Sequence, residues 1–365
     1  TRAGRGYRHI QVHMSHVGPR RPAPSQIHWR IAFTVLAGVL LGACSTLPTD
    51  IRDYGSLTQA IELSDTPFIP QERYQCGPAA LLTVLSVSNA TPPLDEVVER
   101  VYLPGSRGSL QAEITATVRA YGRIPYVVDA GMSAIASEIR AGRPVMVLQN
   151  LGVSWLPRWH YSVVVGIDPL TDQVVLRSGT DARRKTPTNT FLRTWSRSDY
   201  WGLVVLRPGE MPANPEPQRY LQAIAGLEAT GRYHDALSGY DAALTRWPNN
   251  AVALYGAATA SYQLGQLVPA IEYYQRILVA EPGHLSARNN LAYALFDSGY
   301  YEDALRNIQE VIARADEGDP LRSHYLASRD ELCARVSVID PPVAKVKEYC
   351  TCTHECVTPS GSMAR

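Results

Sequence analysis

The sequence predicts an α+β domain followed by an all-α domain of helical repeats. Between residues 67 and 209, segments with helical spacing come first and mostly apolar strands follow, which is typical of an α+β domain with an antiparallel sheet. A linker is expected at 210–218, in a stretch rich in proline. Residues 219–336 then repeat a pattern every 34 residues, which indicates stacked helical hairpins.

The composition is that of a globular chain without a dominant charge. Of 365 residues, 45% are apolar and 19% are charged, and this length suits two or three domains. The 35 basic side chains nearly balance 34 acidic ones, so the formal net charge is +1. We therefore expect no nucleic-acid partner.

The N-terminal segment predicts export. Because the chain does not begin with Met, we expect translation to start at Met14, with a leader and signal peptide over residues 1–43. Residues 31–43 are thirteen uncharged residues in a row. This run is too short for a spanning helix, which needs about 20 residues, but it suits the apolar region of a signal peptide.

The residues around Cys44 indicate how the mature chain is held. The sequence "LGAC" resembles the lipobox of bacterial lipoproteins, which implies that Cys44 becomes a lipid-modified N-terminus. Several acyl chains anchor stably, because each buried methylene adds about 0.8 kcal/mol. By the same resemblance Ser45 favours the periplasmic face of the outer membrane, and residues 44–66 would form a tether. The alternative is an ordinary secretory signal with an unrelated cysteine.

The first domain, residues 67–209, alternates turn residues with apolar segments of two kinds. Four segments have helical spacing and five have the apolar runs of strands. The helices are expected at 76–88, 94–103, 110–122 and 132–142, and the strands at 124–130, 144–150, 160–168, 173–180 and 200–209.

The second domain, residues 219–336, repeats small and aromatic residues at a fixed interval. The residues that recur every 34 positions are Gly231, Gly265 and Gly299, Ala236, Ala270 and Ala304, Tyr240 and Tyr274, and Pro248 and Pro282. This order resembles the tetratricopeptide repeat, in which the small alanine lets two helices approach. Residues 321–336 would be a capping helix. Such repeats imply a surface for a protein or peptide partner; a mere spacer is the alternative.

The tail, residues 337–365, is expected to be disordered. Its Cys350, Cys352, His354 and Cys356 are too closely spaced for a usual structural zinc site, so no metal and no cofactor is expected. Disulfide pairing does not require Cys76, because an even number of cysteines remains beside Cys44 and Cys76: Cys333, Cys350, Cys352 and Cys356.

Cys76 is the candidate nucleophile. It could also be a buried core thiol or half of a disulfide. "QCGPAALL" places it at the start of a helix, where Gly77 permits close approach and Pro78 fits the first turn. Unpaired amides and the helix dipole favour a thiolate at that position, so we expect a pKa below the usual value of about 8.5.

His160 is the candidate base. It is the one histidine of the first domain, and it opens the apolar strand "HYSVVVGID". A thiol needs such a base, which can be distant in the sequence. A structural histidine beside a strand is the alternative reading.

"CGPAAL" followed by "HYSVVVG" resembles the bacteriocin-processing (double-glycine) peptidases, which have a papain-like fold. The resemblance covers residues 67–209. It implies that Cys76 attacks a peptide carbonyl and that His160 moves the proton. It also implies that Gln71 forms an oxyanion hole with the backbone N–H of Cys76.

The residue that orients the imidazole is left open between two candidates. The family has Asp-Pro on the strand after the histidine, whereas this sequence reads "VVLRSGTD". Ser178 lies near the family's Asp position, and Asp181 is the carboxylate of that window. Either could accept a bond from Nδ1–H of His160. Asp168 lies too far along the same strand.

These features together predict a lipid-anchored periplasmic cysteine peptidase of papain-like fold. The peptidase would cleave a peptide or protein substrate, and the repeats would recruit the substrate or another protein. A scaffold protein with a lapsed peptidase-like domain is the first alternative, because the Asp is missing. A transglutaminase-like acyl transferase, which uses the same Cys–His pair, is the second.

Overall fold

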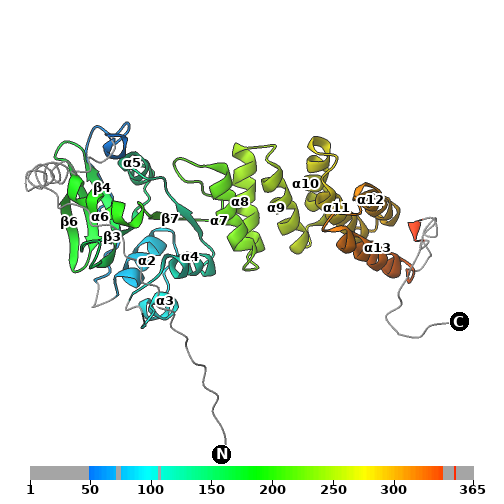
Figure 1. The fold of residues 1–365 in the computed structure, drawn as a ribbon, viewed down its shortest axis with the longest axis horizontal. Helices are drawn as coiled ribbons and strands as arrows, with labels where there is room; N and C mark the ends of the chain where they lie inside the picture. The colour runs from blue at the N-terminus through cyan, green and yellow to red at the C-terminus, as the bar shows by residue number, and fades with distance from the viewer. Residues whose placement is uncertain (1–48, 71–74, 106–107, 340–348, 351–365) are drawn as a thin grey trace, which may run out of the picture. The chain divides into compact units, whose positions relative to one another are not determined.

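The computed structural model describes residues 49–70, 75–105, 108–339 and 349–350 (Figure 1). Gln71 and Cys44 lie outside these residues, as do Cys352, His354 and Cys356, so what the sequence suggests for them stays a prediction.

The first domain has an antiparallel sheet with helices, as the sequence predicts. Its helices are α2 (Cys76–Val87), α3 (Leu94–Val101), α4 (Gln111–Ala120), α5 (Met132–Arg140) and α6 (Thr188–Trp195), with short 3-10 turns η1 (Thr49–Arg52) and η2 (Ser196–Ser198). Its strands are β1 (Ile61–Glu62), β2 (Ile124–Val127), β3 (Val145–Asn150), β4 (Trp159–Asp168), β5 (Gln173–Ser178), β6 (Asp181–Pro187) and β7 (Gly202–Leu206).

The strands form one sheet in the order β2-β7-β3-β4-β5-β6, and β1 pairs with β4. Every pair is antiparallel. Figure 1 shows α2, α3 and α4 grouped on one side of this domain. Helix α2 packs against β4, and the core between them contains Leu81, Leu85, Tyr161 and Val163. This packing brings the N-terminus of α2 to the start of β4.

Part of the expected tether is folded. Residues 61–62 pair with β4, and Leu63 N donates to Val165 O at 2.8 Å. Earlier in the segment, the hydroxyl of Tyr54 donates to Asp172 at 2.7 Å. Residues 49–66 therefore belong to the sheet domain, which corrects the tether of residues 44–66 over this part. A two-residue strand is too short to show a pattern in the sequence.

The sequence patterns do not predict two elements that follow β5. β6 is an edge strand whose residues are nearly all exposed, and its sequence "DARRKTP" has no apolar alternation. Helix α6 follows directly from Pro187. Patterning cannot detect an exposed edge strand, because no face of it is buried.

The linker ends in a capped helix start. Glu216 accepts hydrogen bonds from the backbone of Gln218 and Arg219 with its side chain, and Pro217 is the first residue of the helix. Just before it, Asn214 O accepts a bond from the hydroxyl of Tyr126 at 3.3 Å. The same hydroxyl accepts a bond from Glu216 N at 3.1 Å, so Tyr126 attaches residues 210–218 to β2.

The second domain is a series of antiparallel helix pairs. They are α7 (Pro217–Glu228) with α8 (Tyr233–Arg246), α9 (Ala251–Gln263) with α10 (Leu267–Ala280), α11 (Leu285–Asp297) with α12 (Tyr301–Arg314), and the final α13 (Arg322–Val336). The glycine between the two helices of each pair has a positive φ of 76°, 71° or 85°, at Gly231, Gly265 and Gly299. Glycine adopts this conformation without strain, which explains its 34-residue period.

One residue of the tail is bonded to the last helix. Cys333 in α13 and Cys350 form a disulfide, with 5.6 Å between their Cα atoms. Among the residues that the structure describes, no cluster of three or more acidic, Cys or His side chains could hold a metal. In the same part of the chain, no helix combines the length and the apolar character that crossing a membrane requires.

Gly256→Ala is expected to destabilise the repeats. A Cβ on Gly256 would overlap the ring of Tyr240, which is 2% exposed and is held by Glu228 at 2.7 Å. We expect the free energy of unfolding to fall by about 1–2 kcal/mol. The measurement is thermal unfolding followed by circular dichroism. Gly283→Ala is the control, because a Cβ there meets nothing within 4 Å; equal effects would contradict this packing.

Candidate active site

Helix α2 fixes the position of Cys76. Cys76 is the first residue of the helix, and every residue from Gly77 to Leu85 is buried. The rest of the domain surrounds this part of the helix on every side, as is typical of a sequence that is apolar on all sides. A Cβ at Gly77 would overlap the side chain of Ser109, so glycine lets that loop approach. The half-buried thiol is a free cysteine.

Three backbone amides lie at the sulfur of Cys76. They belong to Cys76 itself, to Gly77 and to Tyr161, and each favours the thiolate. Burial opposes them and is the larger effect, so the pKa of the Cys76 thiol is raised. The sequence predicted a lowered pKa, and this expectation is wrong. A helix N-terminus lowers a thiol pKa only where desolvation does not exceed it.

The backbone amide of Tyr161 lies near the thiol and next to the candidate base in the chain. Its N–H belongs to the peptide bond that follows His160, so the start of β4 lies at the mouth of α2. A backbone donor leaves no trace in residue types, and the sequence could not reveal it.

His160 is held by a neighbouring strand. Its Nε2 lies 2.8 Å from the hydroxyl of Ser178 at the end of β5. The sequence predicts such a bond on Nδ1, and the structure corrects it to Nε2. The Nδ1 atom is then left for another partner, which suits a base that must face a thiol.

The imidazole of His160 is neutral in the resting protein. Burial is the main cause, and the positive charges of Arg184 and Arg158 add to it, so the pKa of His160 falls to about 4. A neutral imidazole can accept a proton, whereas an imidazolium cannot. The resting pair is therefore a thiol and an imidazole, without a preformed ion pair.

The structure separates the two candidates for orienting His160. Ser178 contacts the ring. Asp181 lies opposite Ser178 in the β5–β6 ladder, but its carboxylate accepts a bond from Arg183 N at 3.0 Å. Asp168 caps the turn at the far end of β4, where it accepts a bond from Thr171 at 2.7 Å.

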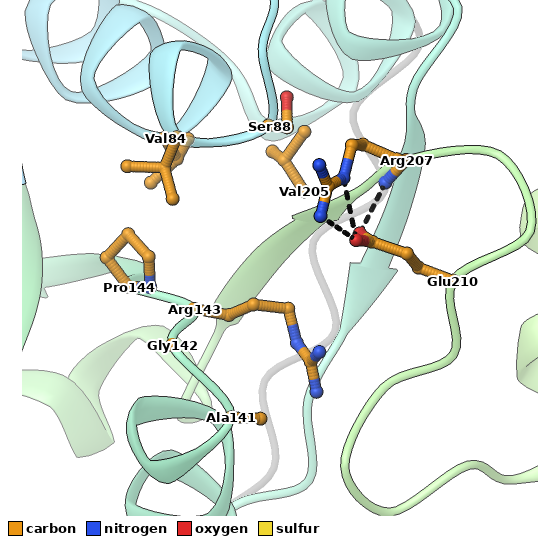
Figure 2. A pocket seen from close by; sticks show the side chains of 10 residues that line it. Val84, Ser88, Ala141, Gly142, Arg143, Pro144, Val205, Arg207 and Glu210 are labelled. Carbon is orange, nitrogen blue, oxygen red and sulfur yellow. Dashed lines mark hydrogen bonds and ion pairs between the residues drawn. The ribbon is translucent and has the colours of Figure 1, made fainter.

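A pocket of about 90 Å³ lies at the other end of α2. Figure 2 shows Val84 of α2 and Ser88, the residue that follows α2, on its wall, with Arg207 bonded to Glu210. Cys76 and Ser88 are twelve positions apart, or about 18 Å of helix. The pocket is thus remote from the thiol, and its charged groups already have partners; Arg143 pairs with Glu138 at 2.6 Å.

Comparisons with known proteins agree with both domains. Residues 63–201 match the model of the Peptidase_C39 like family. Residues 226–284 and 269–320 match a tetratricopeptide repeat model. The chain therefore combines a peptidase C39-like domain with tetratricopeptide repeats, as the sequence predicted.

Individual relatives cover single parts of the chain. An N-terminal acetyltransferase A complex subunit-like protein of Schizosaccharomyces pombe is 28% identical over 34% of this chain and 18% of its own length. A tetratricopeptide repeat and J domain-containing co-chaperone of Fusarium oxysporum f. sp. lycopersici is 31% identical over 27% and 19%. The chain thus spans less than a fifth of either relative.

Solved structures resemble the two domains separately. A C39-like protein from Bacillus anthracis has 15% identity and a TM-score of 0.35, covering 41% of this chain and 98% of its own. The Sgt2 repeat domain from Aspergillus fumigatus has 19% identity and a TM-score of 0.32, covering 42% and 95%.

Alkylation of Cys76 is expected to be slow near neutral pH. Since the pKa of the thiol is raised, little thiolate is present, and the rate should keep rising above about pH 9, where a free cysteine levels off. The measurement is the iodoacetamide rate at the peptide that contains Cys76, followed by mass spectrometry. Cys76→Ser is the control for assignment. A rate that is already maximal at pH 7 would show a lowered pKa.

Ser178→Ala is expected to loosen His160. For any hydrolysis that depends on Cys76, loss of one hydrogen bond should lower kcat/KM by about tenfold with little change in stability, because the ring loses its fixed orientation. Asp181→Ala is the matched control on the facing strand and should change kcat/KM by less than about twofold. The reverse order of effects would make Asp181 the orienting residue.

Proposed function

We propose that the sheet domain is a cysteine peptidase in which Cys76 is the nucleophile and His160 the base. The observation that carries the proposal is the meeting of two elements. The thiol at the N-terminus of α2 lies at the backbone amide of Tyr161, which follows His160. The hydroxyl of Ser178 contacts Nε2 of the imidazole. The match of residues 63–201 to a peptidase C39-like family supports this chemistry.

The reaction begins from neutral groups. His160 takes the thiol proton as the Cys76 sulfur attacks the peptide carbonyl, and a tetrahedral intermediate forms. The imidazolium then gives the proton to the departing amine, and a thioester remains. Water, deprotonated by His160, hydrolyses the thioester and restores the thiol.

The negative charge on the carbonyl oxygen needs donors. The N–H of Cys76 is one, and the family resemblance supplies Gln71 as the other. Each such donor lowers the barrier by about 2.7–4 kcal/mol.

We further propose that the mature protein is anchored through Cys44 and faces the periplasm. The disulfide between Cys333 and Cys350 supports an oxidising compartment. The repeats would recruit the substrate or another protein, the usual role of stacked helical hairpins.

A binding protein that has lost catalysis is the second candidate. The raised pKa of Cys76 and the hydroxyl of Ser178, in place of a carboxylate, favour it. A hydroxyl stabilises an imidazolium less than a carboxylate does.

Hydrolysis by the purified protein separates these candidates. The protein is incubated with a peptide library from a bacterial proteome, and new N-termini are identified by mass spectrometry. Cys76→Ala and His160→Ala should each reduce cleavage by about 1000-fold or more, because the two groups act as a unit. Cleavage that survives Cys76→Ala would exclude the proposed nucleophile. A lack of cleavage by the unaltered protein would favour the binding protein.

Cys44→Ala is expected to release the protein from the membrane fraction. The folded domains should keep their circular dichroism spectrum, because Cys44 precedes the residues that form the sheet and the repeats. The measurement is fractionation of cells that express each form. An unaltered protein found free in the soluble fraction, with an unmodified N-terminus, would contradict the anchor.

A further inference from the structure

Two arginines share the surroundings of His160. Arg158 precedes it by two residues in the chain. Arg184 reaches it across the sheet: Leu176 pairs with Val164 on one side and with Arg184 on the other. Directly paired residues point to the same face of a sheet, and His160 and Val164 share a face by alternation. Arg184 therefore lies on the His160 face.

Neither arginine has a partner within the part of the chain that the structure describes. Both are exposed, and no ion pair or side-chain hydrogen bond involves them there. The neighbouring Arg183 differs, since it points to the other face and binds Glu62 at 2.7 Å. The two unpaired positive charges also help to keep His160 neutral. In the described part of the chain, no carboxylate pairs with either guanidinium, so both can bind one from a ligand.

An apolar hairpin carries Arg158 and leads into His160. Residues 151–158 connect β3 to β4, and their exposed fractions are high for such side chains: 84% for Trp155 and 59% for Leu156. Trp159, the residue before His160, is 53% exposed. Solvent-exposed apolar side chains gathered in one place mark binding surfaces.

The hairpin is held in shape by polar contacts. The side-chain oxygen of Asn150 accepts bonds from Gly152 N and Arg158 N, both at 2.9 Å. Arg197 donates to Asn150 O at 3.0 Å and to Gly152 O. A surface fixed before binding loses little entropy when a ligand arrives.

We propose that this surface binds the substrate peptide itself, with Arg158 and Arg184 holding a carboxylate of the peptide and Trp155 and Leu156 contacting a large apolar side chain. The inference rests on the proposed function, because it places the scissile bond at Cys76 and His160. The position of the hairpin favours a peptide, because its last residues are adjacent to His160 in the chain. A peptide whose scissile bond lies at His160 would extend over it. Charge complementarity favours a carboxylate, which guanidinium groups bind with paired hydrogen bonds.

The carboxylate has two possible sources, an acidic side chain and a free C-terminus. Four pools of rhodamine-labelled octapeptides distinguish them. Each pool has a fixed central Phe-Glu or Phe-Gln and randomised flanks without acidic residues, and each ends in an amide or in a free carboxylate. Binding is measured by fluorescence anisotropy with the full chain that carries Cys76→Ala, so the outcome does not depend on hydrolysis.

We expect a pool with a carboxylate to bind about tenfold more tightly than the Phe-Gln amide pool. Arg158→Gln together with Arg184→Gln should abolish this preference. Trp155→Ala should weaken every pool. The matched control is Lys185→Gln, which removes one charge from the same strand on the opposite face and should leave the preference intact. The carboxylate pool that binds more tightly identifies the source of the carboxylate.

Equal binding of all four pools would overturn the proposal, as would an equal effect of Lys185→Gln. Tryptophan and arginine also suit a lipid surface. Binding of vesicles of phosphatidylethanolamine and phosphatidylglycerol that needs Trp155, without any preference among the peptide pools, would overturn it too. A different result would refute only the proposed peptidase function. In that case the Cys76→Ala protein would still bind the carboxylate pools more tightly, while the unaltered protein would cleave no peptide.

Discussion

The burial of α2 against β4 is the constraint on which the candidate site depends. The helix has no solvent-facing stripe from Gly77 to Leu85, so it can neither rotate nor slide without opening the core. Its first residue, Cys76, is consequently fixed at the amide of Tyr161, and the side chain of His160 follows from the same strand. The packing of α2 against β4 thus determines the positions of both Cys76 and His160.

The same burial determines the charge state of the pair. It raises the pKa of Cys76 and lowers that of His160, so both groups are neutral near pH 7. A peptide that brings one carboxylate to Arg158 and Arg184 would offset one of the two positive charges that disfavour an imidazolium. Substrate binding would then favour the proton transfer that attack requires, and the resting thiol would stay unreactive.

Local sequence patterns made part of the fold and of the candidate site predictable. The start of α2 at Cys76, the opening of β4 near His160 and the glycines between repeat helices are each written into a short stretch of sequence. The pKa of Cys76 was not predictable, because desolvation depends on residues distant in the chain. β6 was missed since an exposed edge strand has no apolar face, and the choice of Ser178 over Asp181 depends on the register of two strands.

The most direct test of the account is the covalent intermediate. The protein is mixed with a cleaved peptide, quenched in acid within milliseconds, and digested for mass spectrometry. The account predicts an acyl group in thioester linkage on the peptide that contains Cys76, and its loss in the His160→Ala variant. Rapid cleavage of the substrate with no acyl group on Cys76 at any quench time would contradict it.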